Sequence, residues 1–224
     1  DGAGTAELGK PAACVVGLDH DRPSVETARR RHASSHLEFR LADLAQPWPV
    51  GDADVVVAFQ IIEHFEDDDA FVRHALAALR PGGKLVITTP NRLRSFSENP
   101  YHVREYTHRE LAKLLERHGR IIDFRGVFGN ELVEAFDERR REQVQKWLRL
   151  DPLRLRDRLP RTVVQAGFAT LSTLVRRRAS SEADLVRPIT ADDFEVRAGD
   201  LDDCLDLFVV VERGADPLEG AGPR

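Results

Sequence analysis

Apolar residues near the middle of the chain fall into short β-branched runs that flank a segment with helical spacing. Residues 54–59 form a run long enough for a buried strand and too short for a buried helix. Residues 69–80 carry apolar side chains at helical spacing, and residues 81–83, Pro-Gly-Gly, stop that helix because proline cannot continue it and glycine accepts a left-handed turn. Residues 84–89 form a second apolar run. The pattern predicts a β-α-β unit with parallel strands.

The alternation of strand and helix patterns continues on both sides of this unit. Pro23 lies in the first turn of a helix that runs to about His32. Thr107 and Glu110 form a capping-box pattern, which begins a helix ending at Gly119. Further elements are expected as a glycine-rich turn and short helix at 2–8, strands at 14–18, 37–41 and 121–128, and a last strand at 204–212 that runs antiparallel to its neighbour.

Strands that alternate with helices in this way indicate a doubly wound α/β domain. In an open parallel sheet, ligands bind beyond the carboxyl ends of the strands, which here are 59–60 and 89–91. From 131 to about 178 the pattern is helical and basic, because residues 139–178 carry twelve Arg or Lys against three acids. We therefore expect an α/β core at 1–130, a helical basic insertion or lid at 131–189, a closing core strand at 190–213 and a disordered tail at 214–224.

The composition fits one folded domain and gives no sign of a membrane span. The 224 residues are 42% hydrophobic with a net charge of −5, enough for one sizeable core. No apolar run approaches the roughly 18 residues that a bilayer requires, and no signal peptide opens the chain, so we expect a cytoplasmic protein. Cys14 and Cys204 predict two free thiols. Methionine is absent and the first residues read as mid-domain sequence, so we expect a fragment whose first strand lies upstream.

The middle of the chain also carries recognisable sequence motifs. Asp54 and the apolar residues after it, then Glu63-His64, then Leu79-Arg80-Pro81-Gly82-Gly83-Lys84-Leu85, resemble the later part of the class I S-adenosylmethionine-dependent methyltransferases. This resemblance implies a Rossmann-like, mostly parallel sheet with an antiparallel last strand. It also implies S-adenosyl-L-methionine as the cofactor.

The resemblance assigns cofactor contacts to the ends of successive strands. In this family the acidic residue that ends the second strand binds the ribose hydroxyls, because a carboxylate accepts from both. Asp19 matches that acid, and Asp43 matches a residue that accepts from the adenine amino group. The structural alternatives are a strand-end turn for Asp19 and a loop aspartate for Asp43. The full predicted set is Asp1, Gly2, Asp19, His20, Asp43, Leu44, Phe59 and Gln60.

Two registers are open for the family's Gly-x-Gly-x-Gly loop, which holds the methionine end of the cofactor. Residues 2–6, Gly-Ala-Gly-Thr-Ala, put alanine in place of the third glycine and leave twelve residues before Asp19 for a helix, a turn and a strand. Asp1-Gly2 as the tail of Gly-x-Gly-Asp-Gly leaves sixteen, and we favour that register. The alternative for Gly2 is a simple helix start.

Glu63-His64 carries the candidate chemistry. In two metal-dependent branches of the family, the ubiquinone O-methyltransferases and the small-RNA 3′-end methyltransferases, a Glu-x-x-Glu-His segment supplies metal ligands, and the RNA branch adds a later histidine, which His102 matches. Here Gln60 replaces the first carboxylate, which weakens a site for Mg²⁺. We therefore expect no metal, with Glu63, His64 and His102 as the alternative ligands. His64 and His102 are the candidate catalytic bases, since imidazole titrates near neutrality, or else polar residues at the pocket rim.

The remaining segments indicate which partners the protein could bind. The loop at 99–107 follows a core strand and covers the expected acceptor pocket, where Tyr101 and Arg104 are candidate contacts for an anionic or sugar substrate. The apolar stretch within 159–178, flanked by arginines, fits a peripheral membrane helix, a substrate lid or a solvated basic face. The acidic chain with few aromatic residues does not favour nucleic acid.

Together these patterns predict methyl transfer from S-adenosylmethionine to a small-molecule or glycan-type acceptor, with oxygen as the expected nucleophile. Two other functions remain open from the sequence. One is a nicotinamide-dependent Rossmann enzyme, which Asp19 alone permits. The other is a non-catalytic module that keeps the fold as a binding platform.

Overall fold

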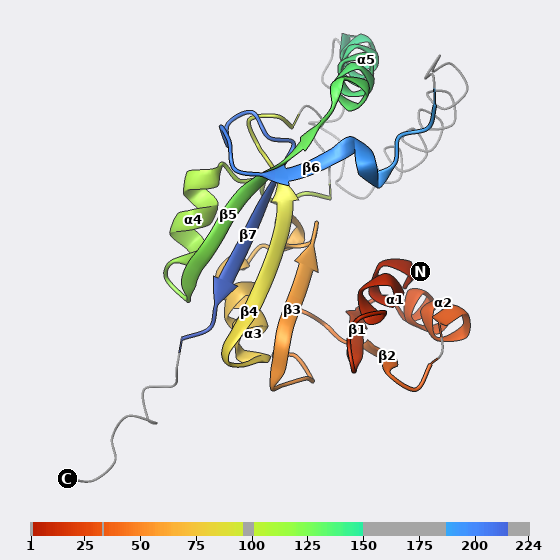
Figure 1. Ribbon diagram of the computed structural model, residues 1–224, viewed down its shortest axis with the longest axis vertical. Helices are drawn as coiled ribbons and strands as arrows, with labels where there is room; N and C mark the ends of the chain where they lie inside the picture. The colour runs from red at the N-terminus through yellow and green to blue at the C-terminus, as the bar shows by residue number, and fades with distance from the viewer. Residues whose placement is uncertain (1, 33, 96–100, 150–186, 215–224) are drawn as a thin grey trace, which may run out of the picture.

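The computed structural model describes residues 2–32, 34–95, 101–149 and 187–214, and Figure 1 shows their arrangement. The strands form two sheets, a pair ordered β1-β2 and a five-stranded sheet ordered β3-β4-β7-β5-β6. Helices cover the strands, so the mixed α/β class predicted from the sequence is confirmed.

The first sheet belongs to the N-terminal part of the chain. It pairs β1 (Val15–Asp19) in parallel with β2 (Leu37–Leu41), next to α1 (Ala3–Gly9) and α2 (Arg22–His32). All four elements were predicted within one or two residues. A small separate core holds this unit together, made of Val25, Ala28 and Phe39 with Leu37 packed against it.

The predicted β-α-β unit forms the start of the larger sheet. β3 (Ala53–Phe59) pairs in parallel with β4 (Leu79–Pro90), with Phe59 opposite Thr88. Between them lie the short 3₁₀ helix η1 (Ile62–His64) and α3 (Asp68–Ala77). α3 buries one face against the sheet through side chains three and four residues apart, namely Phe71, Val72, Ala75 and Leu76, which join the main core.

The end of α3 differs from the prediction. The helix stops at Ala77 and not at Arg80, and the Pro-Gly-Gly turn lies inside a longer β4. The register slips at this point, because Ala53 pairs with Leu79 while Val55 pairs with Lys84. Gly82 absorbs the irregularity with φ +73°, and its N–H donates to the carbonyl of Arg213, the residue after β7. The turn is therefore stabilised by the last strand, which the local pattern does not reveal.

The last strand enters the middle of the larger sheet. β7 (Asp206–Glu212) lies antiparallel between β4 and β5 (Arg120–Gly129), as the predicted orientation required. Its first residue, Asp206, lies beside Pro90 at the carboxyl end of β4. A late part of the chain is thereby brought to the edge of the sheet where ligands bind in this fold.

Four further elements complete the larger unit. α4 (His108–Leu115) starts at the predicted capping box but ends four residues before Gly119, because the backbone turns after Leu115. α5 (Glu131–Arg149) begins the predicted helical insertion. The edge strand β6 (Phe194–Arg197), preceded by the 3₁₀ helix η2 (Ala191–Asp193), was not predicted.

A buried aspartate closes the base of the insertion. Asp193 is 2% exposed, and it accepts hydrogen bonds from the Asn130 amide before α5 and from the Arg187 guanidinium. The Arg187 guanidinium and the Thr190 backbone N–H hold the pKa of Asp193 well below its usual range. Asn130, which precedes α5, and Asp193, which precedes β6, are therefore in direct contact.

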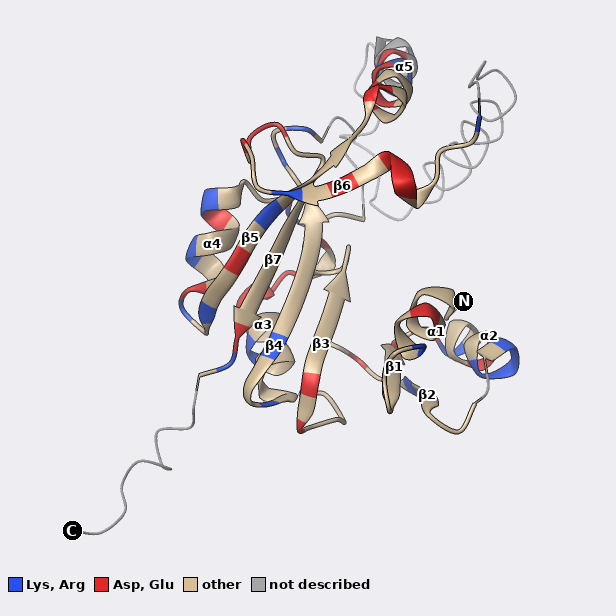
Figure 2. Cartoon of the chain, in the orientation of Figure 1, with Lys and Arg blue, Asp and Glu red and all other residues tan. Residues whose placement is uncertain are grey.

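Charges of both signs are interspersed along α4 and β5 (Figure 2). Among the residues that the structure describes, no helix combines the length and apolar character needed to cross a bilayer. The segment 159–178, predicted to contact a membrane, lies outside the described residues, as does the predicted disordered tail beyond residue 214.

Candidate functional site

A strained turn marks the carboxyl end of β3. Gln60 has φ +53°, a left-handed conformation that is uncommon for residues other than glycine. Its backbone N–H donates to the Thr88 carbonyl of β4 at 2.9 Å, which keeps the turn attached to the sheet. The turn leads directly into η1, so the residues of η1 lie beyond the strand ends.

Glu63 is the most unusual side chain of η1. It is 1% exposed, and Thr89 donates a hydrogen bond to one carboxyl oxygen, Oε2, at 2.9 Å. The other oxygen, Oε1, is buried without a hydrogen-bond partner. Burial raises the pKa of Glu63 above its ordinary value. A buried carboxylate oxygen without a partner is costly and typical of a functional site.

Two histidines lie beside this carboxylate. The ring centroids of His64 and His102 are 5.1 Å apart in an edge-to-face arrangement. One ligand atom from each histidine and one carboxyl oxygen of Glu63 all lie within 4.8 Å of one another. The structure thus brings together the three residues that the sequence grouped as catalytic bases or alternative metal ligands.

Hydrogen bonds select the tautomer of both rings. His64 Nδ1 lies 2.9 Å from the Tyr101 carbonyl oxygen, and His102 Nδ1 lies 2.7 Å from Glu105 Oε1. A carbonyl and a carboxylate only accept, so each Nδ1 carries the proton. When the ring is neutral, the lone pair of each Nε2 is then left to act as a base or a ligand.

The loop that carries His102 is anchored to α3. Tyr106 is fully buried, and its hydroxyl donates to Asp68 Oδ2 at 2.9 Å. Arg104 donates to the same oxygen at 3.0 Å and lies 5.0 Å from the Tyr106 ring centroid. The backbone N–H of Val103 donates to the Glu63 carbonyl at 2.8 Å. Arg104, a predicted substrate contact, is therefore engaged in holding the loop in place.

The N-terminal unit holds several of the residues predicted to bind the cofactor. Asp19 ends β1 with an exposed side chain, and its Oδ1 accepts the Asp21 backbone N–H at 2.9 Å. His20 is exposed beside it, with Nδ1 3.6 Å from the same oxygen. A turn contact of this kind leaves Asp19 Oδ2 available to a ligand.

The two glycines at the start of α1 differ in whether a larger residue could replace them. Gly2 has φ +82°, and a Cβ there would lie 2.6 Å from Ala28 Cβ, so only glycine fits. Gly4 lies within α1 with open space around it, so another residue would fit. This geometry favours the register in which Gly2 is the final glycine of the loop. Asp1 lies outside the described residues.

The other predicted cofactor residues divide into exposed and buried ones. Asp43 is exposed, and its Oδ1 accepts the Ala45 backbone N–H at 3.0 Å. Phe59 is 49% exposed at the end of β3. Leu44, by contrast, belongs to the main core, because the chain after β2 turns alternate side chains inward. The burial of Leu44 is therefore explained by packing within the main core.

Asp206 was not predicted as a site residue. It lies at the start of β7, opposite Pro90 of β4, and is half-buried. Burial, with the nearby charges of Glu63 and Asp137, raises the pKa of Asp206 to about 6. The sequence did offer one signal for Asp206. It is near the start of a strand predicted to be antiparallel, and the start of such a strand lies beside the carboxyl end of its neighbour.

The polar residue that ends β4 has a structural role. Asn91 is fully buried, and its side-chain amide donates to the carbonyls of Leu201, Asp202 and Cys204 at 2.9, 3.2 and 2.9 Å. Asn91 lies in the strand end 89–91, and its side chain faces the protein interior and not the edge where ligands are expected. Its amide fixes the turn that leads into β7.

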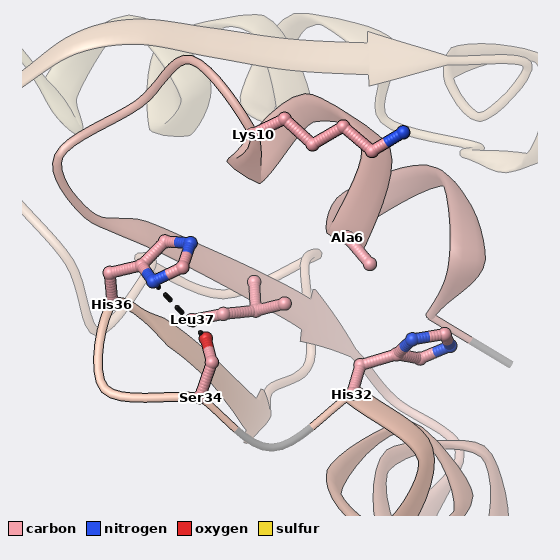
Figure 3. A pocket seen from close by; sticks show the side chains of 6 residues that line it. All are labelled: Ala6, Lys10, His32, Ser34, His36 and Leu37. Atoms are coloured by element: carbon pink, nitrogen blue, oxygen red, sulfur yellow. Dashed lines mark hydrogen bonds between the residues drawn. The ribbon is translucent and has the colours of Figure 1, made fainter.

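A shallow hollow of about 360 Å³ lies on the N-terminal unit (Figure 3). It is formed at the amino end of β2, whereas Asp19 ends β1 at the opposite edge of the parallel pair. Its only drawn hydrogen bond joins Ser34 Oγ and His36 Nδ1 at 3.3 Å. The lining side chains are Ala6, Lys10, His32, Ser34, His36 and Leu37, none of which was predicted as a site residue.

Comparisons with known proteins place the chain in a family. The family described as "Methyltransferase domain" matches residues 1–87. A probable S-adenosylmethionine-dependent methyltransferase of Mycolicibacterium smegmatis is 32% identical over 223 residues, covering 95% of this chain and 78% of the relative. A ubiquinone biosynthesis O-methyltransferase of Bradyrhizobium sp. is 31% identical over 97 residues, covering 41% of this chain and 38% of the relative.

The crystal structure of the 4+2 cyclase SpnF has the same fold, with a TM-score of 0.58 and 16% identity over 96% of this chain and 72% of SpnF. The similarity to the Mycolicibacterium relative extends along nearly the whole chain. The chain belongs to the S-adenosylmethionine-dependent methyltransferases, and S-adenosylmethionine is its cofactor.

Proposed function

We propose that this methyltransferase acts on an oxygen atom of a small-molecule or glycan-type acceptor. The observation that carries the proposal is the pair His64 and His102, each with its Nδ1 proton fixed and its Nε2 lone pair left over beyond the strand ends. A hydroxyl becomes a good nucleophile only when its proton is taken up, and a neutral imidazole does this. The partial similarity to a ubiquinone biosynthesis O-methyltransferase supports the same acceptor atom.

The residues present fit the cofactor. Gly2 forms a close approach that any Cβ would fill, and Asp19 presents a carboxylate at the end of β1 for the ribose hydroxyls. Asp43 and Phe59 are both exposed at strand ends and would contact the adenosine part of the cofactor. When bound, S-adenosylmethionine supplies an electrophilic methyl group on a sulfonium sulfur.

The protein contributes alignment and a base. His102 takes the acceptor proton on Nε2, and Glu105 stabilises the resulting imidazolium through its bond to Nδ1. His64 packs against the edge of this ring and limits its rotation. The anchored loop at 101–107 holds both rings relative to η1, where they would orient the hydroxyl of a bound acceptor.

A label-transfer assay tests the acceptor atom. The protein is incubated with S-adenosyl-[methyl-³H]methionine and matched hydroxyl, amine and carboxyl acceptors, both aromatic compounds and sugars, and the products are separated. We expect label in hydroxyl acceptors as ethers. Label confined to amine or carboxyl acceptors would contradict the proposal. The cofactor-binding control is S-adenosylhomocysteine affinity, which is expected to fall about tenfold in Asp19→Ala as charge-assisted hydrogen bonds are lost.

A cation-assisted version is a second candidate, favoured by the cluster of Glu63, His64 and His102. Two imidazoles and one carboxylate within 4.8 Å form a ligand set suited to Zn²⁺, Mn²⁺ or Fe²⁺. The bonds from Tyr101 and Glu105 orient the rings as outer ligands of a metal site do. The buried Oε1 of Glu63 would then have a partner.

Metal titration distinguishes the two candidates. If a cation binds, calorimetry with Zn²⁺ or Mn²⁺ gives one site, and Glu63→Gln weakens it about 10- to 100-fold, because the anionic ligand is lost. Asp67→Asn, which removes an exposed carboxylate outside the cluster, is the matched control. Absence of a site in the unaltered protein, with label transfer unaffected by EDTA, would leave the histidine base as the mechanism.

A further inference from the structure

The two groups that orient the rings of His64 and His102 come from one short loop. They are the Tyr101 carbonyl oxygen, 2.9 Å from His64 Nδ1, and Glu105 Oε1, 2.7 Å from His102 Nδ1. The side chains of His102 and Glu105 are only 17% and 15% exposed, so the bond between them is shielded from water. The direction of each Nε2 lone pair therefore depends on where the loop at 101–107 lies.

Backbone hydrogen bonds attach this loop to η1 and to the chain after β4. The N–H groups of Val103 and Arg104 both donate to the Glu63 carbonyl, at 2.8 and 3.2 Å. Further along, the Tyr106 carbonyl accepts the Arg92 N–H at 2.9 Å. The carboxylate that orients the proposed base lies between these two attachments, where its placement depends on the side chains on either side of it.

Those two side chains end on a single carboxylate oxygen of α3. The Tyr106 hydroxyl donates to Asp68 Oδ2 at 2.9 Å, and Arg104 donates to the same oxygen at 3.0 Å. Arg104 and Tyr106 flank Glu105 in the sequence, so the two bonds enclose the residue that holds the His102 ring. Asp68 is the first residue of α3 and its side chain is 13% exposed, so it offers the loop a fixed acceptor. Hydrogen bonds to an ionised acceptor are stronger than those between neutral groups.

The hydroxyl of Tyr106 remains a donor at the pH where imidazole acts as a base. The side chain is fully buried, and this burial together with the charge of Asp68 raises the pKa of Tyr106 above its ordinary value. The Arg104 guanidinium lies 5.0 Å from the centroid of the same ring, within the range of a cation–π contact. The three side chains therefore contact one another in pairs.

We propose that Asp68 is a positioning residue for methyl transfer, which acts through the loop and not by contact with the acceptor. Its carboxylate fixes Tyr106 and Arg104. Glu105 lies between them, so its bond to His102 has one geometry and the Nε2 lone pair has one direction. The inference rests on the proposed function, because it takes His102 as the base. Proton uptake requires a hydrogen-bonded approach to the acceptor hydroxyl, so a displacement of about 1 Å is costly.

Removal of the acceptor oxygen tests the proposal kinetically. In Asp68→Ala both bonds are lost, and we expect kcat for the hydroxyl acceptor to fall about 10- to 100-fold. The Kd of S-adenosylhomocysteine is expected to stay within about twofold, because the loop lies on the acceptor side. Asp68→Asn keeps an oxygen that accepts from Tyr106, so its kcat is expected to return to within about threefold of that of the unaltered protein.

The tautomer of His102 gives a readout that a merely structural role would not change. Nitrogen-15 NMR of ring-labelled histidine distinguishes a proton on Nδ1 from a proton on Nε2, and the His102 signals are assigned by their absence in His102→Asn. In the unaltered protein we expect the Nδ1–H form, because Glu105 accepts that proton. In Asp68→Ala we expect a mixture of the two forms, and in Asp68→Asn a return of the Nδ1–H form.

Asp67→Ala is the matched control. Asp67 is the neighbouring exposed carboxylate, and it caps α3 by accepting the Ala70 N–H at 2.8 Å. Loss of this cap lowers the melting temperature but leaves the loop in place. We therefore expect kcat and the ring spectrum of this variant to stay as in the unaltered protein.

Three results would overturn the positioning role of Asp68. They are an unaltered His102 ring spectrum in Asp68→Ala, a kcat that falls no further than in Asp67→Ala, and a loss of S-adenosylhomocysteine affinity in parallel with kcat. If the unaltered protein transfers no label to hydroxyl acceptors, the proposed function fails instead. The ring spectrum then still decides whether Asp68 orients His102.

Discussion

Replacing His102 with asparagine is expected to lower kcat for methyl transfer to a hydroxyl acceptor by about 10²- to 10⁴-fold. The imidazole is held for this role, because Glu105 accepts the Nδ1 proton at 2.7 Å and leaves the Nε2 lone pair for the acceptor. Asparagine retains a donor for Glu105 but provides no base. The measurement is steady-state kinetics with the acceptor found in the label-transfer assay.

Two controls separate catalysis from folding. His108→Asn removes a histidine at the start of α4 that pairs with Asp202, and kcat is expected to change less than twofold. The affinity of His102→Asn for S-adenosylhomocysteine is expected to stay within twofold, because the ring lies on the acceptor side. Loss of cofactor affinity in parallel with kcat would show that His102 acts on binding. An unchanged kcat would remove it from the reaction.

The sequence predicted the β-α-β unit because its signals are local. A β-branched run at β3, a helical spacing at α3 and a second run at β4 each form their element without help from distant residues. The capping box at Thr107 and Glu110 is local in the same way, and both of its bonds are present. The grouping of His64 with His102 came from the family resemblance, and in the structure the anchored loop returns His102 to the ring of His64.

Features that depend on distant pairing could not be predicted. The position of Asp206 requires β7 to enter between β4 and β5, more than a hundred residues after β4. The short exposed strand β6 is formed by pairing with β5 and has no alternating pattern of its own. Asn91 lies in the strand end 89–91, beyond which ligands were expected, whereas the partners of its side chain lie about 110 residues further along the chain. In each case the deciding interaction is a long-range hydrogen bond.

Asn91→Ala is expected to lower the free energy of unfolding by about 2–4 kcal/mol. The fully buried amide donates to three carbonyls of the turn before β7, and its Oδ1 accepts the Leu93 backbone N–H at 3.1 Å. Alanine leaves these groups without partners in the core, where desolvated polar atoms are costly. Urea denaturation followed by circular dichroism measures the loss, and the exposed substitution Gln46→Ala is expected to stay within about 0.5 kcal/mol of the unaltered protein.

The variant Asn91→Asp tests more sharply whether the donated hydrogen bonds make Asn91 necessary. Asn91→Asp keeps the shape of the side chain but replaces the donor with an oxygen that faces three carbonyl oxygens, so at neutral pH it should destabilise at least as much as alanine. Protonation restores one donor, and the pKa of the introduced acid is therefore raised in the folded state. Its stability relative to Asn91→Ala is then expected to increase as the pH falls towards 4, because the folded state binds the extra proton. A pH-independent difference between the two variants would show that packing volume, and not the donated hydrogen bonds, makes Asn91 necessary.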